Sequence, residues 1–208
     1  MYVAYKYVPK KYAGSFEDGS QLLFGTLSYY RKMEGDRADG LEGWGVNLVS
    51  SLQNANSENQ PDIFHRLEKL GQNFQNVKTL NMKNVMFLSQ HQETLLFCAS
   101  KDRDMSRVEK GDIEFRIDHF EVFCSLIAYH EHWSILYPAI HQITYEDRIS
   151  DLSISDPIFA NPFAKPKDFS WENEVRAAWP VLPNMNFDAD GKIVVNCPEV
   201  SPFITRLS

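Results

Sequence analysis

The chain has 208 residues, of which 43% are hydrophobic and 24% charged, a composition that excludes disordered and low-complexity classes. Its 21 Lys and Arg against 28 Asp and Glu give a formal net charge of −7. That balance argues against a general nucleic-acid or anionic-membrane surface, because both need a positive face. At this length we expect one domain over residues 1–208.

Cysteine usage and the N-terminus bear on the cellular compartment. The three cysteines, Cys98, Cys124 and Cys197, are odd in number and share no short metal-binding spacing, so we expect reduced thiols rather than a disulfide framework. The N-terminal segment lacks the apolar core of a signal peptide, and no run reaches the roughly 20 apolar residues that span a bilayer. These features favour a cytoplasmic protein with no membrane partner.

In the N-terminal quarter, alternating Tyr and Val over 2–8 predict a strand that ends at Pro9. A second strand over 22–26 and an aromatic helical turn over 27–32 follow. The glycine-rich segment that comes next is expected to be a loop. Its acids, from Asp36 to Glu42, could bind a hard cation or accept backbone donors, and the structural role is favoured because the spacing of a Ca²⁺ loop is not met.

The middle of the chain mixes helical and strand patterns. Residues 50–60 are polar and weakly patterned, which favours a mobile loop or an insertion. Residues 61–70 have the spacing of an amphipathic helix. The apolar runs 85–89 and 95–100 are interpreted as a hairpin of two buried strands. The remaining predictions are a strand over 113–117, a core-facing helix over 119–130 and a strand over 140–145.

Three elements are predicted near the C-terminus. They are a strand over 174–179 stopped by Pro180, a turn over 188–191 leading to a strand over 193–196, and a final short helix or tail over 200–207. Strands and helices follow one another without a regular βαβ repeat and without internal repeats. This order predicts an α+β fold with a mainly antiparallel sheet.

Two glutamates are the first candidate for chemistry, since the motifs of P-loop, dinucleotide-binding, serine-hydrolase and zinc-protease families are absent. Glu172 and Glu174 stand two residues apart at a predicted strand start, which places both carboxylates on one face. Neighbouring like charges raise a carboxyl pKa and suit acid–base work, and a carboxylate can stabilise a cation. The alternative is a pair of solvated acids on an edge strand, continued by Arg176.

Other side chains offer weaker candidates. Ser100 ends an apolar strand and could contact a ligand or cap the next turn, and no base that would activate its hydroxyl is identifiable. His130 and His132, with His141, could bind a metal ion, but a role at the end of the preceding helix is favoured, so we expect no metal site. Arg31 could contact a phosphate.

Several segments, taken in order, resemble a widespread bacterial and phage family of unknown function. They are an opening YKYV, an acidic DRADGLEG loop, a strand LFCASKD, the segment IHQITYEDR and a closing KPKDFSWENEVR, which together extend over about 5–176. Their arrangement resembles the ADP-ribosyltransferase fold, a split β-sandwich with flanking helices in which NAD binds between two small sheets. The resemblance implies NAD as a substrate, with no metal required.

The resemblance also implies roles for residues at matching positions. Glu174 would contact the nicotinamide ribose and stabilise the oxocarbenium ion, with Ser100 orienting it or the ribose, and Glu172 would select or deprotonate the acceptor. Lys6 would be a point charge on the first strand, where an arginine would form a planar clamp. The expected cofactor-binding residues are Lys6, Tyr7, Arg31 and Ser100.

Three functions follow from these features. The first is an NAD-using enzyme, a mono-ADP-ribosyltransferase or NAD glycohydrolase, serving in conflict between bacteria and phage. Its ligand would be small and phosphate-bearing, and its acceptor a protein or a nucleic acid. The second is a non-catalytic binding or regulatory protein on the same scaffold, and the third is a metal-dependent nuclease or hydrolase using Glu172, Glu174 and the acidic loop.

Overall fold

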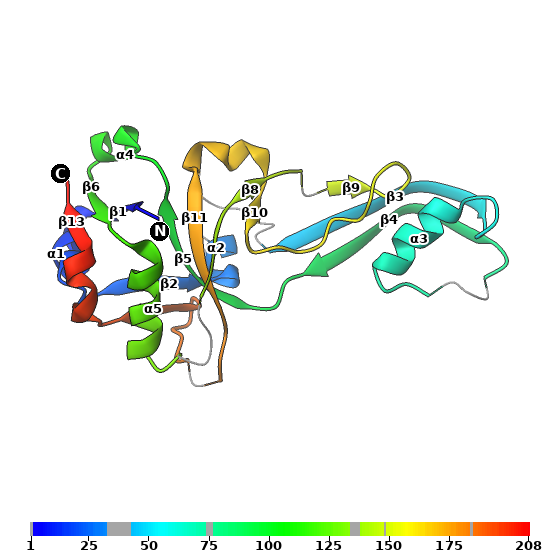
Figure 1. Ribbon diagram of the computed structural model, residues 1–208. Coiled ribbons are helices and arrows are strands. Elements are labelled where there is room, and N and C mark those ends of the chain that lie inside the picture. The colour runs from blue at the N-terminus through cyan, green and yellow to red at the C-terminus, as the bar shows by residue number, and fades with distance from the viewer. Residues whose placement is uncertain (1, 33–42, 74–76, 134–137, 148, 184) are drawn as a thin grey trace.

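The computed structural model describes residues 2–32, 43–73, 77–133, 138–147, 149–183 and 185–208. Figure 1 shows a body around a large sheet and an arm that extends from it, formed by β3, β4, β9 and α3. The predicted acidic cluster from Asp36 to Glu42 lies outside the described residues.

The body is built on an eight-stranded sheet. Its strands are β1 (Ala4–Pro9), β2 (Leu22–Thr26), β5 (Thr94–Ser100), β6 (Asp112–Ile117), β7 (Ala139–Gln142), β11 (Glu174–Pro180), β12 (Lys192–Val195) and β13 (Ile204–Arg206). The strand order is β12-β2-β5-β1-β6-β13, and β11 lies between β5 and β7. Every pairing in this sheet is antiparallel, which confirms the predicted α+β class and sheet type.

Short helices flank the sheet, and the longest of them covers the core. The α-helices of the body are α1 (Ala13–Glu17), α2 (Leu27–Lys32), α4 (Met105–Glu109) and α5 (Phe120–His130), and the 3-10 segments are η1 (Lys10–Tyr12), η2 (Lys167–Glu172) and η3 (Pro198–Phe203). α5 buries Phe120 and Phe123 against the sheet. Rings fill much of this core: Phe24 lies 5.6 Å from both Trp133 and Trp179, in edge-to-face geometry that aromatic pairs favour.

The arm has a hydrophobic cluster of its own. β3 (Trp44–Ala55) pairs antiparallel with β4 (Leu80–Gln90) and parallel with β9 (Ile149–Asp151). The predicted amphipathic helix is confirmed as α3 (Pro61–Lys69). Its Phe64 and Leu67 are buried with Leu52 of β3 and Leu152.

Two predictions that concern the arm are wrong. Residues 50–55 are not a loop but the second half of β3, whose polar side chains face solvent while Leu52 and Ala55 pack inward. The runs 85–89 and 95–100 do not form a hairpin, because β4 pairs with β3 in the arm and β5 joins the body. In both cases a long-range strand partner, which local patterning does not reveal, decided the structure.

The remaining segments complete the body. The predicted strand over 140–145 divides at Ile143 into β7 and β8 (Thr144–Tyr145), and β8 pairs in parallel with β10 (Ala164–Lys165). The predicted C-terminal helix or tail is η3 followed by β13. All three cysteines are free thiols, as predicted. Within the described ranges, no helix has the length and apolar character needed to cross a bilayer.

Candidate functional site

A cavity opens where the sheet of the body is discontinuous. β11 pairs with β5 along its whole length, so β1 and β2 share the other edge of β5. They occupy opposite ends of that edge: β1 pairs at Ser100, whereas β2 pairs at Leu95 and Leu96. A cavity of about 520 Å³ is lined by residues of β1, β2 and β5 at this gap, and its volume falls in the range of small-molecule sites, about 300–1,000 Å³.

Lys6 spans the gap between the two strands. Its Nζ donates to the backbone carbonyl of Cys98, which lies midway between the residues of β5 that pair with β1 and β2. Nζ also lies 4.7 Å from the centre of the Phe97 ring. The ammonium therefore satisfies a carbonyl that a continuous sheet would have paired, and it places a positive charge in the cavity wall.

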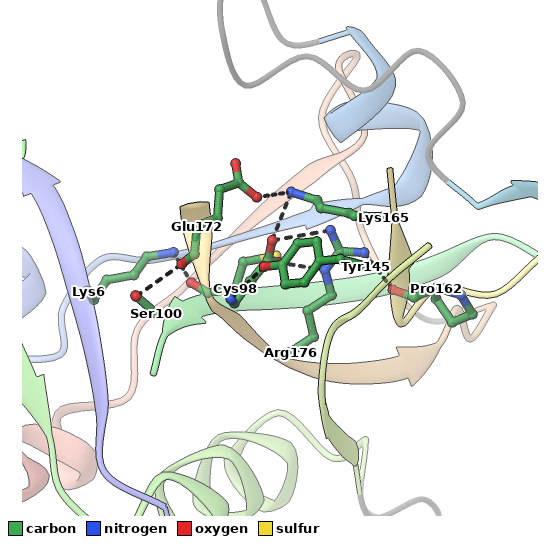
Figure 2. A network of polar contacts seen from close by, with 9 residues as sticks. Lys6, Cys98, Ser100, Tyr145, Pro162, Lys165, Glu172 and Arg176 are labelled. Atoms are coloured by element: carbon green, nitrogen blue, oxygen red, sulfur yellow. Dashed lines mark hydrogen bonds and ion pairs between the residues drawn. The ribbon is translucent and has the colours of Figure 1, made fainter. Parts of the chain in front are cut away.

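Glu172 and Glu174 both form an ion pair with Lys165 (Figure 2). Nζ of Lys165 lies 2.5 Å from Oε2 of Glu172 and 2.8 Å from Oε2 of Glu174. On the other side of Glu174, Nε of Arg176 lies 2.5 Å from Oε1. Glu174, Lys165 and Arg176 are all buried. Two carboxylates and two cations therefore alternate in a row, of which Glu172, Lys165 and Glu174 line the cavity and Arg176 does not.

The backbone brings the two glutamates together in a way that differs from the prediction. Glu172 ends η2, and Asn173 adopts a left-handed conformation with φ of 40°, so β11 begins only at Glu174. The expected placement on one face by strand alternation is therefore wrong, because only one of the two residues belongs to the strand. The alternative of solvated acids on an edge strand is also wrong, since β11 lies between β5 and β7 and Glu174 is only 5% exposed.

The two carboxyl groups have opposite pKa shifts. Burial opposes ionisation of Glu174, but the charges of Arg176 and Lys165 outweigh it and hold the pKa well below the usual value. Burial raises the pKa of Glu172, and the charge of Lys165 only partly offsets that effect. Glu174 is thus a permanent anion, whereas Glu172 can take up and release a proton more readily, the division of roles that acid–base catalysis requires.

A shell of polar groups fixes the pair in place. The backbone N–H of Glu174 donates to the hydroxyl of Tyr145 at 2.8 Å, and Nη1 of Arg176 donates to the carbonyl of Pro162 at 2.5 Å. Burial raises the pKa of the Cys98 thiol to about 12, so Cys98 stays protonated and its thiol donates to Glu174. These contacts connect β5, β8 and β11 around one carboxylate (Figure 2).

Ser100 contacts backbone carbonyls next to the two glutamates. Its hydroxyl donates to the carbonyl of Asp102 at 2.7 Å and lies 3.1 Å from the carbonyl of Glu172. It therefore braces the turn after β5 and the end of η2, while its side chain also borders the cavity. These contacts are with backbone carbonyls and not with the carboxylate of Glu174, so the orienting role of Ser100 stays a prediction.

Two predicted cofactor-binding residues lie in different surroundings. Tyr7 borders the cavity, and its hydroxyl donates to Glu114 at 3.1 Å and accepts from the backbone N–H of Asp104. Burial raises the pKa of Tyr7 to about 12. Arg31 lies at the end of α2, where Nη2 donates to Ser28 and lies 3.5 Å from Glu93, so it is engaged away from the residues that line the cavity.

Sequence reasoning missed several residues that line the cavity. Lys165 is the most important, because it joins Glu172 to Glu174, and its signal in the sequence is a lysine that follows the apolar residues Phe163 and Ala164. The missed charged and aromatic lining residues include Asp104, Arg107, Lys165, Lys192 and Trp171. They come from segments far apart in the chain, so no local motif unites them.

Comparisons with protein-family models, with curated proteins and with solved structures found no match.

Proposed function

We propose that the cavity binds NAD and that the chain cleaves its nicotinamide N-glycosidic bond, as a mono-ADP-ribosyltransferase or an NAD glycohydrolase. One observation carries the proposal: the gap between β1 and β2 gathers Lys6, Ser100 and the pair of glutamates around one cavity. That arrangement is the one implied by the resemblance to ADP-ribosyltransferases. We propose on the same ground that the fold is a split β-sandwich of the ADP-ribosyltransferase type.

The charge of the cavity supports a phosphate-bearing ligand. Four cations line it, Lys6, Arg107, Lys165 and Lys192, against three acids, Asp104, Glu172 and Glu174. Arg176 offsets part of the charge of Glu174, while Asp112 pairs with Arg107, and Asp188 and Asp190 pair with Lys192. The cavity therefore gathers cations although the whole chain carries a net charge of −7, and a phosphate would compete with these acids for them. Lysine and arginine side chains are the usual protein partners of a pyrophosphate.

Aromatic side chains on the cavity wall suit the rings of a dinucleotide. Tyr29 and Tyr30 from α2 face the cavity together with Trp171 from η2. Trp171 is 53% exposed, although large aromatic side chains are normally well buried. An exposed indole at the edge of a charged cavity can stack on a base or on the nicotinamide ring.

The glutamates would divide the chemistry between them. As the bond between ribose C1′ and nicotinamide nitrogen breaks, its electron pair leaves with nicotinamide and positive charge develops on the ribose. Glu174, which stays ionised, stabilises that charge, and Glu172 accepts the proton of the attacking water or acceptor group. The products are nicotinamide, the ADP-ribosylated acceptor or ADP-ribose, and one proton.

A second candidate is a binding protein without catalysis. It is favoured by the ion pairs of Glu174 with Arg176 and Lys165, which make this carboxylate part of a buried structural network. A metal-dependent hydrolase has less support, because the ammonium of Lys165 occupies the position between the two carboxylates that a metal ion would need.

Ligand-dependent thermal unfolding tests the proposal. We expect NAD and ADP-ribose to raise the melting temperature of the full chain, because a ligand that binds only the native state stabilises it. Trp171→Ala should weaken NAD binding by about 2- to 13-fold, the equivalent of one lost ring contact of about 0.5–1.5 kcal/mol. Phe159→Ala is the matched control, since Phe159 is 52% exposed and Trp171 is 53% exposed, but only Trp171 lines the cavity.

The outcomes separate the three functions. Stabilisation by NAD without any cleavage supports the binding protein, and stabilisation by Mg²⁺ or Mn²⁺ but by neither nucleotide supports the hydrolase. If Trp171→Ala and Phe159→Ala bind NAD with equal affinity, the proposal that NAD binds in this cavity is contradicted.

A further inference from the structure

Away from the cavity, the end of α5 and the start of η3 bring together an imidazole, a thiol and a carboxylate. One ligand atom each from His130, Cys197 and Glu199 lies within 4.8 Å of the other two. α5 and η3 are in contact and run side by side in Figure 1. Tertiary packing rather than a sequence motif assembles this group, which explains why the sequence paired His130 with His132 instead.

The distances within the group suit a tetrahedral ion. Nδ1 of His130 lies 3.5 Å from Oε2 of Glu199. Zinc bound to a nitrogen and an oxygen at about 2.0–2.2 Å in tetrahedral geometry would hold these two atoms about 3.4 Å apart. Sγ of Cys197 lies within 4.8 Å of a ring nitrogen of His130 and of a carboxylate oxygen of Glu199, so a shift of about 1 Å would complete the geometry expected with a sulfur ligand.

The surroundings of the group include a carboxylate near the second ring nitrogen of His130. Nε2 lies 4.0 Å from Oε1 of Glu131, which is longer than a hydrogen bond. A histidine that binds a metal usually turns its second nitrogen to a carboxylate or a carbonyl, and a small movement of Glu131 would supply that contact. Cys197 is buried and its backbone N–H donates to the carbonyl of Gly19 at 2.8 Å, so the thiol is held in place below the exposed His130 and Glu199.

We infer that His130, Cys197 and Glu199 bind a zinc ion that links α5 to η3. A thiolate and an imidazole select zinc over the harder Mg²⁺ and Ca²⁺, which prefer oxygen ligands. The thiol of Cys197 releases its proton to solvent as the metal–sulfur bond forms, and water fills the fourth position. The site is independent of the proposed NAD chemistry, because it is built from other residues.

Cobalt spectroscopy tests the site directly. The full chain, stripped of metal by a chelator, is titrated with Co²⁺, and we expect one equivalent to produce a thiolate-to-cobalt charge-transfer band that Zn²⁺ then abolishes by displacement. The band should be absent in Cys197→Ser and retained in Cys124→Ser. Cys124 is the matched control because it is also a buried, free cysteine.

A second variant keeps the test decisive if Cys197→Ser fails to fold. His130 has a side chain 37% exposed, so His130→Gln should fold. We expect it to bind Zn²⁺ about 100-fold or more weakly, above the 10- to 100-fold loss that follows removal of an outer hydrogen-bonding partner. The inference is overturned if the native chain gives no charge-transfer band, if the band persists in Cys197→Ser, or if His130→Gln binds Zn²⁺ with unchanged affinity.

Discussion

Replacing Arg176 by methionine removes the buried cation that the network around Glu174 depends on. Arg176 is 0% exposed, and its guanidinium donates to Glu174 at 2.5 Å and to the carbonyl of Pro162 at 2.5 Å. Methionine has a similar length and no charge, so Arg176→Met leaves both acceptors without this donor while filling most of the same space.

The expected loss of stability is large. Removing one partner of a buried ion pair costs about 3–5 kcal/mol, because the remaining charge stays buried without compensation. Lys165 still lies 2.8 Å from Glu174, which keeps the expected loss near the lower end, at about 3 kcal/mol. For a chain of 208 residues, this corresponds to a decrease in melting temperature of about 6–12 °C.

Urea unfolding of purified variants measures this loss. Lys167→Met is the matched control, because Lys167 lies 2.9 Å from Asp147 in an exposed pair with side chains 64% and 73% accessible. Such a pair contributes at most about 1 kcal/mol. The double variant Arg176→Met/Glu174→Met should be more stable than Arg176→Met alone, because it no longer buries a carboxylate that has lost one of its two cations. A loss in Arg176→Met no larger than in Lys167→Met would refute the reasoning.

Three further predictions follow from the fold and the site. Leu67→Ala should cost about 2–5 kcal/mol through the cluster of the arm, with NAD affinity in the cavity unchanged, as calorimetry can show. The low pKa of Glu174 in the folded chain contributes stability that is fully present above the pKa of the unfolded chain, about 4.5, and is lost as the pH falls towards the folded pKa. The free energy of unfolding at about pH 5 and the one at about pH 3 should therefore differ less in Glu174→Gln than in the native chain. Ser100→Ala should lower the free energy of unfolding by about 1 kcal/mol and reduce NAD turnover, because Glu172 is displaced. Unchanged turnover would show that Ser100 only stabilises the turn after β5.

Local patterning predicted most of the elements but not their partners. β2, α2, α3, β6, α5 and β11 were predicted within one or two residues, because each has a clear apolar period or a proline at its boundary. The arm was missed because β3 draws its stability from pairing with β4, which lies beyond α3 in the chain. Polar residues on the open face of β3 therefore resembled a loop.

The candidate site was predicted in its residues more than in its geometry. Glu172 and Glu174 do lie close together, but through Lys165 and the left-handed Asn173 rather than through strand alternation. The apolar residues before Lys165 are only a weak signal in the sequence, and its partners could not be predicted, since they lie on η2 and β11 and meet it only in the folded chain. Lys6 was expected as a charge on the first strand, yet its contact with the Cys98 carbonyl depends on the gap in the sheet.

Release of nicotinamide from NAD, followed by proton NMR with the purified chain, tests the central claim most directly. The account predicts release by the native chain and a decrease of about 100-fold or more in Glu172→Gln, the usual contribution of a general base. The account would be contradicted if the native chain released no nicotinamide, or if Glu172→Gln, folded to the same extent, released it at the native rate.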